Sequence, residues 1–135
     1  MIKLIIGTKG SGKTKALIDL VNAALDTSNG AVVCIEKGDK LRFDIRYKCR
    51  LIDAEAYSIT EGHALYGFIA GILASNHDVT DLFIDSALKI CQNDIGEFDL
   101  FLKKLDVLDK MNSLNIVMTS SIAPSEATET MKKFI

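Results

Sequence analysis

The sequence lacks long hydrophobic runs and a strong net charge. Its longest apolar stretch, Leu65 to Ala74, falls short of the roughly 20 residues that a helix needs to cross a bilayer, so we expect no membrane span. The apolar run Ile2 to Ile6 is too short for a secretory signal. The formal net charge of −2 gives no overall attraction to nucleic acid or membranes, so any surface for an anionic partner must be local.

Cysteine is also scarce. The odd number of cysteines, Cys34, Cys49 and Cys91, with no close pair, argues against a disulfide framework and against a structural zinc cluster. His63 and His77 lie far from each other and from any cysteine spacing typical of a metal site. We expect small buried thiols and a reducing, cytoplasmic setting.

What is present is an alternation of short apolar runs and amphipathic segments in a chain of 135 residues. No repeat, low-complexity tract or linker divides it, so we expect one domain over residues 1–135. Strands are predicted at Ile2–Ile6, Ala31–Ile35, Val79–Asp85 and Asn115–Met118, and helices after Lys13, over about 61–76 and 94–112, and from Pro124 to about 134. This order predicts an α/β three-layer fold with a mainly parallel sheet and a binding crevice at the carboxyl ends of the strands.

One segment differs in character from the rest. From Leu41 to Leu51, apolar and charged residues alternate with a period of two, which is typical of a half-buried strand. Because Lys37 to Lys40 offers a turn, we expect Ala31 to Lys48 to form a hairpin-like antiparallel ribbon at one edge of the sheet.

This segment is also basic. Between Lys37 and Arg50 there are six basic and two acidic residues, a local charge of +4. The ribbon from Lys40 to Arg50 can supply an arginine to a neighbouring copy in a homo-oligomer or dock a protein partner, and the alternative is an edge strand protected from aggregation by its charges. Nucleic acid is disfavoured but not excluded, because no aromatic side chain is interleaved on the charged face.

A glycine-rich motif lies between the first predicted strand and helix. The spacing Gly7-x-x-x-x-Gly12-Lys13-Thr14 matches the phosphate-binding loop pattern at every fixed position and in its strand-to-helix context. Its glycines let backbone amides converge on an anion, Lys13 supplies a charge for the β and γ phosphates, and Thr14 should ligate Mg²⁺. We predict binding of ATP with Mg²⁺ by Gly7, Thr8, Lys9, Gly10, Ser11, Gly12, Lys13 and Thr14.

Polar residues at other strand ends are candidates for the remaining chemistry. Asp85 ends an apolar strand, where a P-loop fold places the carboxylate that holds the metal through water; a plain strand-terminating aspartate is the alternative. Ser86 follows where many ATPases have a glutamate that orients water, so Glu36 is the candidate base, unless it is an exposed hairpin glutamate. Thr119 and Ser120 either sense the γ-phosphate or satisfy a strand end.

The chain resembles the P-loop NTPase superfamily over its whole length in the order of its elements, but only at Gly7 to Thr14 and Asp85 as motif. The resemblance implies ATP and Mg²⁺ binding by a small ATPase or nucleotide-dependent switch. The guanine motif Asn-Lys-x-Asp, the switch motif Asp-x-x-Gly and the transporter signature Leu-Ser-Gly-Gly are all missing, which disfavours signalling GTPases and transporter ATPases.

Two narrower resemblances remain. The second strand with Glu36 and the basic ribbon is similar to the core of recombinase-type or secretion and motility ATPases, which implies an oligomer with arginines supplied in trans. The residues after that strand also resemble a run in thymidine kinases, namely Lys37, Asp44, Arg46 and Tyr47, although the paired cysteines of the zinc lasso have no counterpart. The alternatives are therefore a nucleoside kinase-like phosphotransferase and an interaction module that binds nucleotide without efficient hydrolysis.

Overall fold

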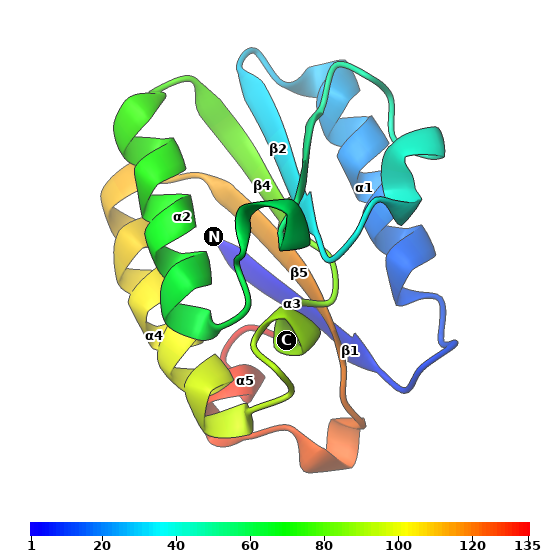
Figure 1. The fold of residues 1–135 in the computed structure, drawn as a ribbon, viewed down its shortest axis with the longest axis vertical. Coiled ribbons are helices and arrows are strands. Elements are labelled where there is room, and N and C mark those ends of the chain that lie inside the picture. Colours follow the sequence, from blue (N-terminus) through cyan, green and yellow to red (C-terminus); the bar gives the residue numbers. More distant parts are fainter.

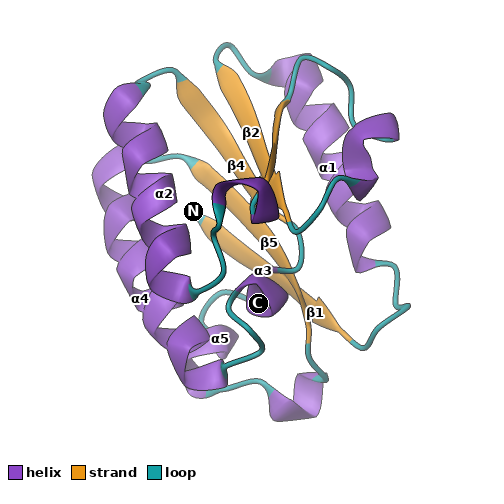
Figure 2. Ribbon diagram, viewed as in Figure 1, coloured by secondary structure: helices purple, strands orange, loops and turns teal.

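A computed structural model describes all residues from Met1 to Ile135 and places a five-stranded sheet between two helical layers (Figures 1 and 2). The strands are β1 Ile2–Gly7, β2 Ala31–Glu36, β3 Arg50–Asp53, β4 Val79–Ile84 and β5 Asn115–Ser121. The helices are α1 Lys13–Thr27, α2 Gly62–Ser75, α3 Ala87–Ile90, α4 Ile95–Asn112 and α5 Glu129–Lys132. The predicted three-layer α/β fold is confirmed.

The strands follow the order β1-β5-β4-β2-β3, and every neighbouring pair is parallel. The last strand in the chain, β5, therefore lies between the strand that leads into the glycine-rich loop and the strand that leads into Asp85. All five carboxyl ends lie along one edge of the sheet, which is where ligands bind in open parallel sheets.

The two faces of the sheet are covered unequally. Helices α2 and α4 cover one face, where the larger core contains fully buried Phe98, Leu65 and Ile69 (Figure 1). Helix α1 covers the other face with the smaller core that includes Leu17 and Val21. Because both faces are buried, the central strands are almost continuously apolar.

The predicted antiparallel ribbon is wrong. Beyond β2 the chain turns into a short 3₁₀ helix, Lys40–Phe43, and β3 then pairs with β2 in parallel, from Val33 opposite Arg50 to Glu36 opposite Asp53. The edge strand is therefore only four residues long, and the basic segment before it is a loop.

The burial of the apolar residues in that segment explains why its alternating pattern wrongly predicted a strand. Leu41, Ile45 and Cys49 are buried in the smaller core with α1, whereas Phe43 is 85% exposed and Tyr47 is 91% exposed. Every second residue is apolar, but only every fourth is buried. Apolar residues thus recur every two positions, but buried residues recur every four. This spacing fits a chain of turns and not a strand.

Smaller corrections concern helix ends. Helix α2 begins after Glu61, whose side chain makes no capping hydrogen bond. The predicted terminal helix is replaced by a 3₁₀ turn, Pro124–Glu126, and the single turn of α5, which Thr128 caps by accepting a hydrogen bond from the amide of Met131 at 3.1 Å. No helix of the fold combines the length and the apolar character that crossing a bilayer requires.

Candidate functional site

The glycine-rich loop follows β1 and ends at the first turn of α1. Gly10 and Gly12 adopt left-handed backbone angles, with φ of 83° and 87°, which favour glycine. A Cβ atom on Gly7 would lie 2.5 Å from Oγ of Ser11, so the Ser11 side chain would have to move to make room for it. Gly10 and Gly12 therefore set the path of the backbone, and Gly7 leaves room for the Ser11 side chain.

The loop presents backbone amides that have no partner within the protein. Between Thr8 and Lys15, only the amide of Ser11 donates a hydrogen bond, to the carbonyl oxygen of Thr8 at 3.2 Å. Hydrogen bonding in α1 begins with the amide of Ala16, which donates to Gly12 at 3.1 Å. The remaining amides and the positive end of the α1 dipole together form an anion-binding concavity.

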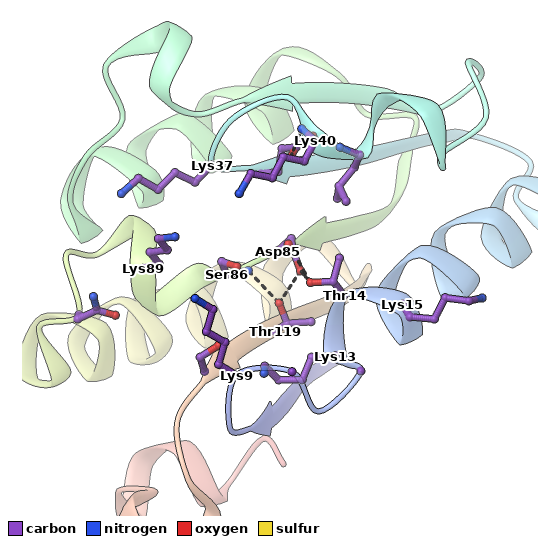
Figure 3. A pocket seen from close by; sticks show the side chains of 16 residues that line it. Lys9, Lys13, Thr14, Lys15, Lys37, Lys40, Asp85, Ser86, Lys89 and Thr119 are labelled. Atoms are coloured by element: carbon purple, nitrogen blue, oxygen red, sulfur yellow. Dashed lines mark hydrogen bonds between the residues drawn. The ribbon is translucent and has the colours of Figure 1, made fainter.

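Lys13 adds a full positive charge to this concavity. Its Nζ lies 2.9 Å from the carbonyl oxygen of Thr8 and 3.4 Å from Oγ of Ser11, so the ammonium group folds over the loop (Figure 3). No carboxylate lies within 4.0 Å of it. The lysine is thus held at the loop by neutral groups and keeps its charge available to an anion.

Asp85 connects three elements of the site. Its carboxylate accepts hydrogen bonds from Oγ1 of Thr14, at 3.2 and 3.3 Å to its two oxygens, and from Oγ1 of Thr119 at 2.7 Å (Figure 3). The Thr119 hydroxyl in turn accepts from the amide of Ser86 at 2.8 Å. The start of α1 and the ends of β4 and β5 therefore meet at one nearly buried carboxylate.

This oxygen-rich group fits Mg²⁺. A hydroxyl from Thr14 and a carboxylate from Asp85 are the hard oxygen ligands that Mg²⁺ prefers, and Mg²⁺ usually completes its octahedron with water and phosphate oxygens.

The two hydroxyl residues predicted at the end of β5 have different partners. Thr119 contacts Asp85, as described, and lines the site. Ser120 is fully buried, and its Oγ accepts a hydrogen bond from the amide of Leu88 at 3.3 Å. Thr119 therefore belongs to the site, whereas Ser120 fastens α3 to the sheet.

Glu36 is buried rather than exposed on a hairpin. It is 2% exposed, and its two carboxylate oxygens accept hydrogen bonds from the amides of Lys40 at 3.0 Å and Leu41 at 3.1 Å. Burial raises the pKa of this carboxyl group, and the negative charges of Asp85 and Asp53 add to the rise, while the two amide hydrogen bonds oppose it. Glu36 thus lies at the end of β2 and anchors the loop that follows.

These groups line one cavity of about 670 Å³ at the carboxyl edge of the sheet (Figure 3). Leu41 is its only hydrophobic lining residue, and Glu36 and Asp85 are its only carboxylates. Six lysines and no arginine complete its charged lining, namely Lys9, Lys13, Lys15, Lys37, Lys40 and Lys89. The cavity is therefore polar and strongly cationic, as a site for a phosphate-rich ligand should be.

Several of these lining residues were not predicted as site residues. Lys37 and Lys40 were assigned to an edge ribbon, and Lys89 and Asn93 lie in and after α3, which the sequence pattern did not predict. The usable signal is positional: Lys89 follows Asp85 by four residues, and residues just after the carboxyl end of a central strand lie at the crevice.

The arginines of the basic segment lie elsewhere. Arg46 forms an ion pair with Asp26 at 2.9 Å and also donates a hydrogen bond to the carbonyl oxygen of Asn22, which ties it to α1. Arg42 forms an ion pair with Asp39 at 3.3 Å. Neither side chain lines the cavity.

No family model and no curated protein matches the chain, so its function is inferred from the geometry of this site.

Proposed function

We propose that this protein is a small member of the P-loop NTPase superfamily that binds ATP with Mg²⁺ and acts as an ATPase or a nucleotide-dependent switch. The observation that carries the proposal is the set of partnerless amides between Thr8 and Lys15, over which Lys13 folds. Backbone amides at a helix N-terminus together with a lysine form a phosphate site that needs no other protein group.

Each group has a defined task in this proposal. The loop amides hold the β-phosphate, and Lys13 reaches the β and γ phosphates. Thr14 and Asp85 would hold Mg²⁺, which when bound supplies neutralisation of phosphate charge. Thr119 links Asp85 to the amide of Ser86, so the carboxylate proposed to hold the metal and the start of α3 share one chain of hydrogen bonds. That linkage supports a switch as well as an ATPase.

Glu36 is the proposed general base if ATP is hydrolysed. It lines the cavity, and burial raises the pKa of its carboxyl group, which brings it closer to the range that suits proton transfer near neutral pH. Its oxygens also accept two amide hydrogen bonds, which fix its orientation. Loss of phosphate release in Glu36→Gln with retained nucleotide binding would support this assignment.

The nucleotide site is tested by comparing Lys13→Ala with Lys103→Ala, a matched control on the exposed surface of α4. Because a charge-assisted hydrogen bond contributes about 1.5–3 kcal/mol, Lys13→Ala should weaken ATP binding about tenfold or more. The measurements are calorimetric titration with ATP and GTP in the presence of Mg²⁺, and phosphate release. Equal ATP affinity in wild type and Lys13→Ala would refute the proposal.

Two further parts of the proposal concern context. The three cysteines are free and buried, which fits a reducing, cytoplasmic setting. Supply of an arginine to a neighbouring copy, or docking of a protein partner, by the segment from Lys40 to Arg50 stays a prediction.

A nucleoside kinase-like phosphotransferase is the second candidate. The observation that favours it is the extension of the cavity beyond the loop to a second group of lysines, on the segments after β2 and β4. A hydrolase needs space there only for water.

A further inference from the structure

The cavity has cationic groups on two opposite sides. Lys9 and Lys13 belong to the glycine-rich loop, whereas Lys37 and Lys40 follow β2 and Lys89 lies on α3 (Figure 3). In the close view Lys37 and Lys40 lie across the cavity from the loop, and Lys89 lies at its side, on α3. We name Lys37, Lys40 and Lys89 the lysine wall.

The lysine wall forms no ion pair, although Glu36 and Asp85 line the same cavity. No carboxylate oxygen lies within 4.0 Å of the ammonium group of Lys37, Lys40 or Lys89. Lys15 in contrast pairs with Asp19 at 2.6 Å, outside the wall. Like charges that share one concave space repel each other and raise the local concentration of anions. A ligand anion between them relieves that repulsion.

The wall is built on fixed backbone. The loop that carries Lys37 and Lys40 is held by the carboxylate of Glu36, and the amide of Gly38 donates to Oδ1 of Asp53 at 2.8 Å. At the same place, the amide of Ala54 donates to the carbonyl oxygen of Glu36 at 2.8 Å. These bonds tie the loop to the ends of both β2 and β3. The backbone that carries these lysines is therefore preorganised, although their side chains are exposed, and a fixed backbone reduces part of the entropic cost of binding.

Lys89 is held in a similar way. The amide of Leu88, its neighbour on α3, donates to the buried Ser120 hydroxyl, and Ala87 is fully buried. Two different elements thus present lysines to one cavity.

The chemistry of the wall indicates the ligand that it holds. The loop amides, Lys13 and Lys9 already provide for a triphosphate, and Mg²⁺ would offset part of its charge. With Leu41 as its only hydrophobic lining residue, the cavity offers no aromatic platform for a base. A phosphate monoester, which carries a charge of about −1.5 to −2 at pH near 7, matches a group of three lysines.

We propose that the lysine wall is a second anion subsite, which binds the phosphate group of a phosphate monoester while a triphosphate occupies the loop. This inference deepens the proposed function and rests on it for the triphosphate half of the cavity. It assigns to the second ligand a chemical class, a small phosphorylated molecule, and to Lys37, Lys40 and Lys89 the task of recognising its phosphate.

The test uses the whole protein saturated with Mg²⁺ and a non-hydrolysable ATP analogue, so that the loop is blocked. Glycerol 3-phosphate is then titrated by calorimetry, with glycerol as the uncharged control. We expect binding of glycerol 3-phosphate but not of glycerol. Because each lysine–phosphate contact contributes about 1.5–3 kcal/mol, Lys40→Ala and Lys89→Ala should each weaken this binding about tenfold, whereas Lys103→Ala should not change it.

Two results would overturn the inference. One is the absence of glycerol 3-phosphate binding to the nucleotide-loaded wild type. The other is a loss of affinity for the ATP analogue in Lys40→Ala and Lys89→Ala as large as the loss in Lys13→Ala, which would assign the wall to the triphosphate itself.

Failure of the proposed function gives a different result. If the ATP analogue does not bind, glycerol 3-phosphate is titrated into the nucleotide-free protein. Binding that Lys40→Ala weakens and Lys13→Ala leaves unchanged keeps the lysine wall as an anion subsite. If glycerol 3-phosphate does not bind, or if Lys40→Ala leaves its affinity unchanged, the inference is overturned.

Discussion

The basic segment between β2 and β3 consists of two halves that the structure uses differently. In the first half, Lys37 and Lys40 line the cavity and have no carboxylate partner. In the second half, Arg42 and Arg46 lie outside the cavity and are paired with aspartates. Residues that are close in sequence and equal in charge therefore line a cavity in one case and form scaffold contacts in the other.

This difference teaches that local charge density does not by itself define a binding surface. The partners that the fold provides decide which cations stay available. Arg46 meets Asp26 because Ile45 and Cys49 are buried against α1 and bring the loop to that helix. The lysines form no ion pair, and the nearby carboxylates Glu36 and Asp53 accept hydrogen bonds from backbone amides of the loop instead.

The largest expected effect is on the anchor of the lysine half. Glu36→Ala leaves the amides of Lys40 and Leu41 without acceptors, and hydrogen bonds to a charged group contribute about 1.5–3 kcal/mol each. Together the two bonds contribute about 3–6 kcal/mol, and loss of the burial cost of the carboxylate offsets part of it, so we expect the free energy of unfolding to fall by about 2–3 kcal/mol in urea titrations. The control is Asp39→Ala in the exposed pair with Arg42, and an unchanged urea midpoint for Glu36→Ala would contradict the anchoring role.

A smaller effect concerns the pH dependence of the same anchor. The pKa of Glu36 is raised above its ordinary value of 4.5, chiefly by burial, so the folded protein binds this proton more tightly than the unfolded chain does. The stabilisation from this group is fully present below the unfolded pKa and is lost as the pH rises through the folded pKa. The stability advantage of wild type over Glu36→Gln should therefore shrink across that window in unfolding curves. A stability advantage of wild type that grows with pH would show that folding lowers the pKa of Glu36 instead of raising it.

A change in the arginine half should affect stability more than binding. The Arg46 side chain is 51% exposed and its partner Asp26 is 64% exposed, so solvent screening limits the ion pair, and with the hydrogen bond to Asn22 we expect Arg46→Ala to cost about 0.5–1 kcal/mol. ATP and glycerol 3-phosphate affinity should stay unchanged. Lys40→Ala should do the reverse, with unchanged stability and weaker glycerol 3-phosphate binding. Equal binding losses in both variants would erase the distinction between the two halves.

The smallest effect is expected for Arg42→Ala. Its ion pair with Asp39 is exposed, and its guanidinium lies 4.8 Å from the centre of the exposed Phe43 ring. Such contacts contribute about 0.5 kcal/mol or less at a surface, so thermal unfolding should change little. A stability loss comparable to that of Glu36→Ala would show that the arginine half carries a contact that its exposure hides.

Much of the fold was predictable because its elements have clear local patterns. The strands that begin at Ile2, Ala31, Val79 and Asn115 were predicted from continuous apolar runs, and α4 from helical spacing. The four-residue α3 was not predicted, because a single turn is too short for a period to appear. The prediction of an antiparallel ribbon was wrong because the alternation in the sequence did not indicate which apolar residues would be buried.

The candidate site was predictable in part for the same reason. The loop and Asp85 follow from spacing and from the end of an apolar strand. The contact of Asp85 with Thr119 depends on β5 lying next to β4, and sequence patterns give no strand order. The anchoring of the loop by Glu36 depends on the turn that replaced the predicted hairpin.

The sequence alone determined the glycine-rich loop, because glycine backbone freedom, the lysine and the strand-to-helix context are all local properties of Gly7 to Thr14. It also determined the alternation of strands and helices. Only the tertiary structure decided which cations face the cavity, because that depends on which carboxylates and apolar residues distant segments bring to the same place. Lys89 and Lys40 are far apart in sequence, and they line one cavity because parallel strands end at one edge of the sheet.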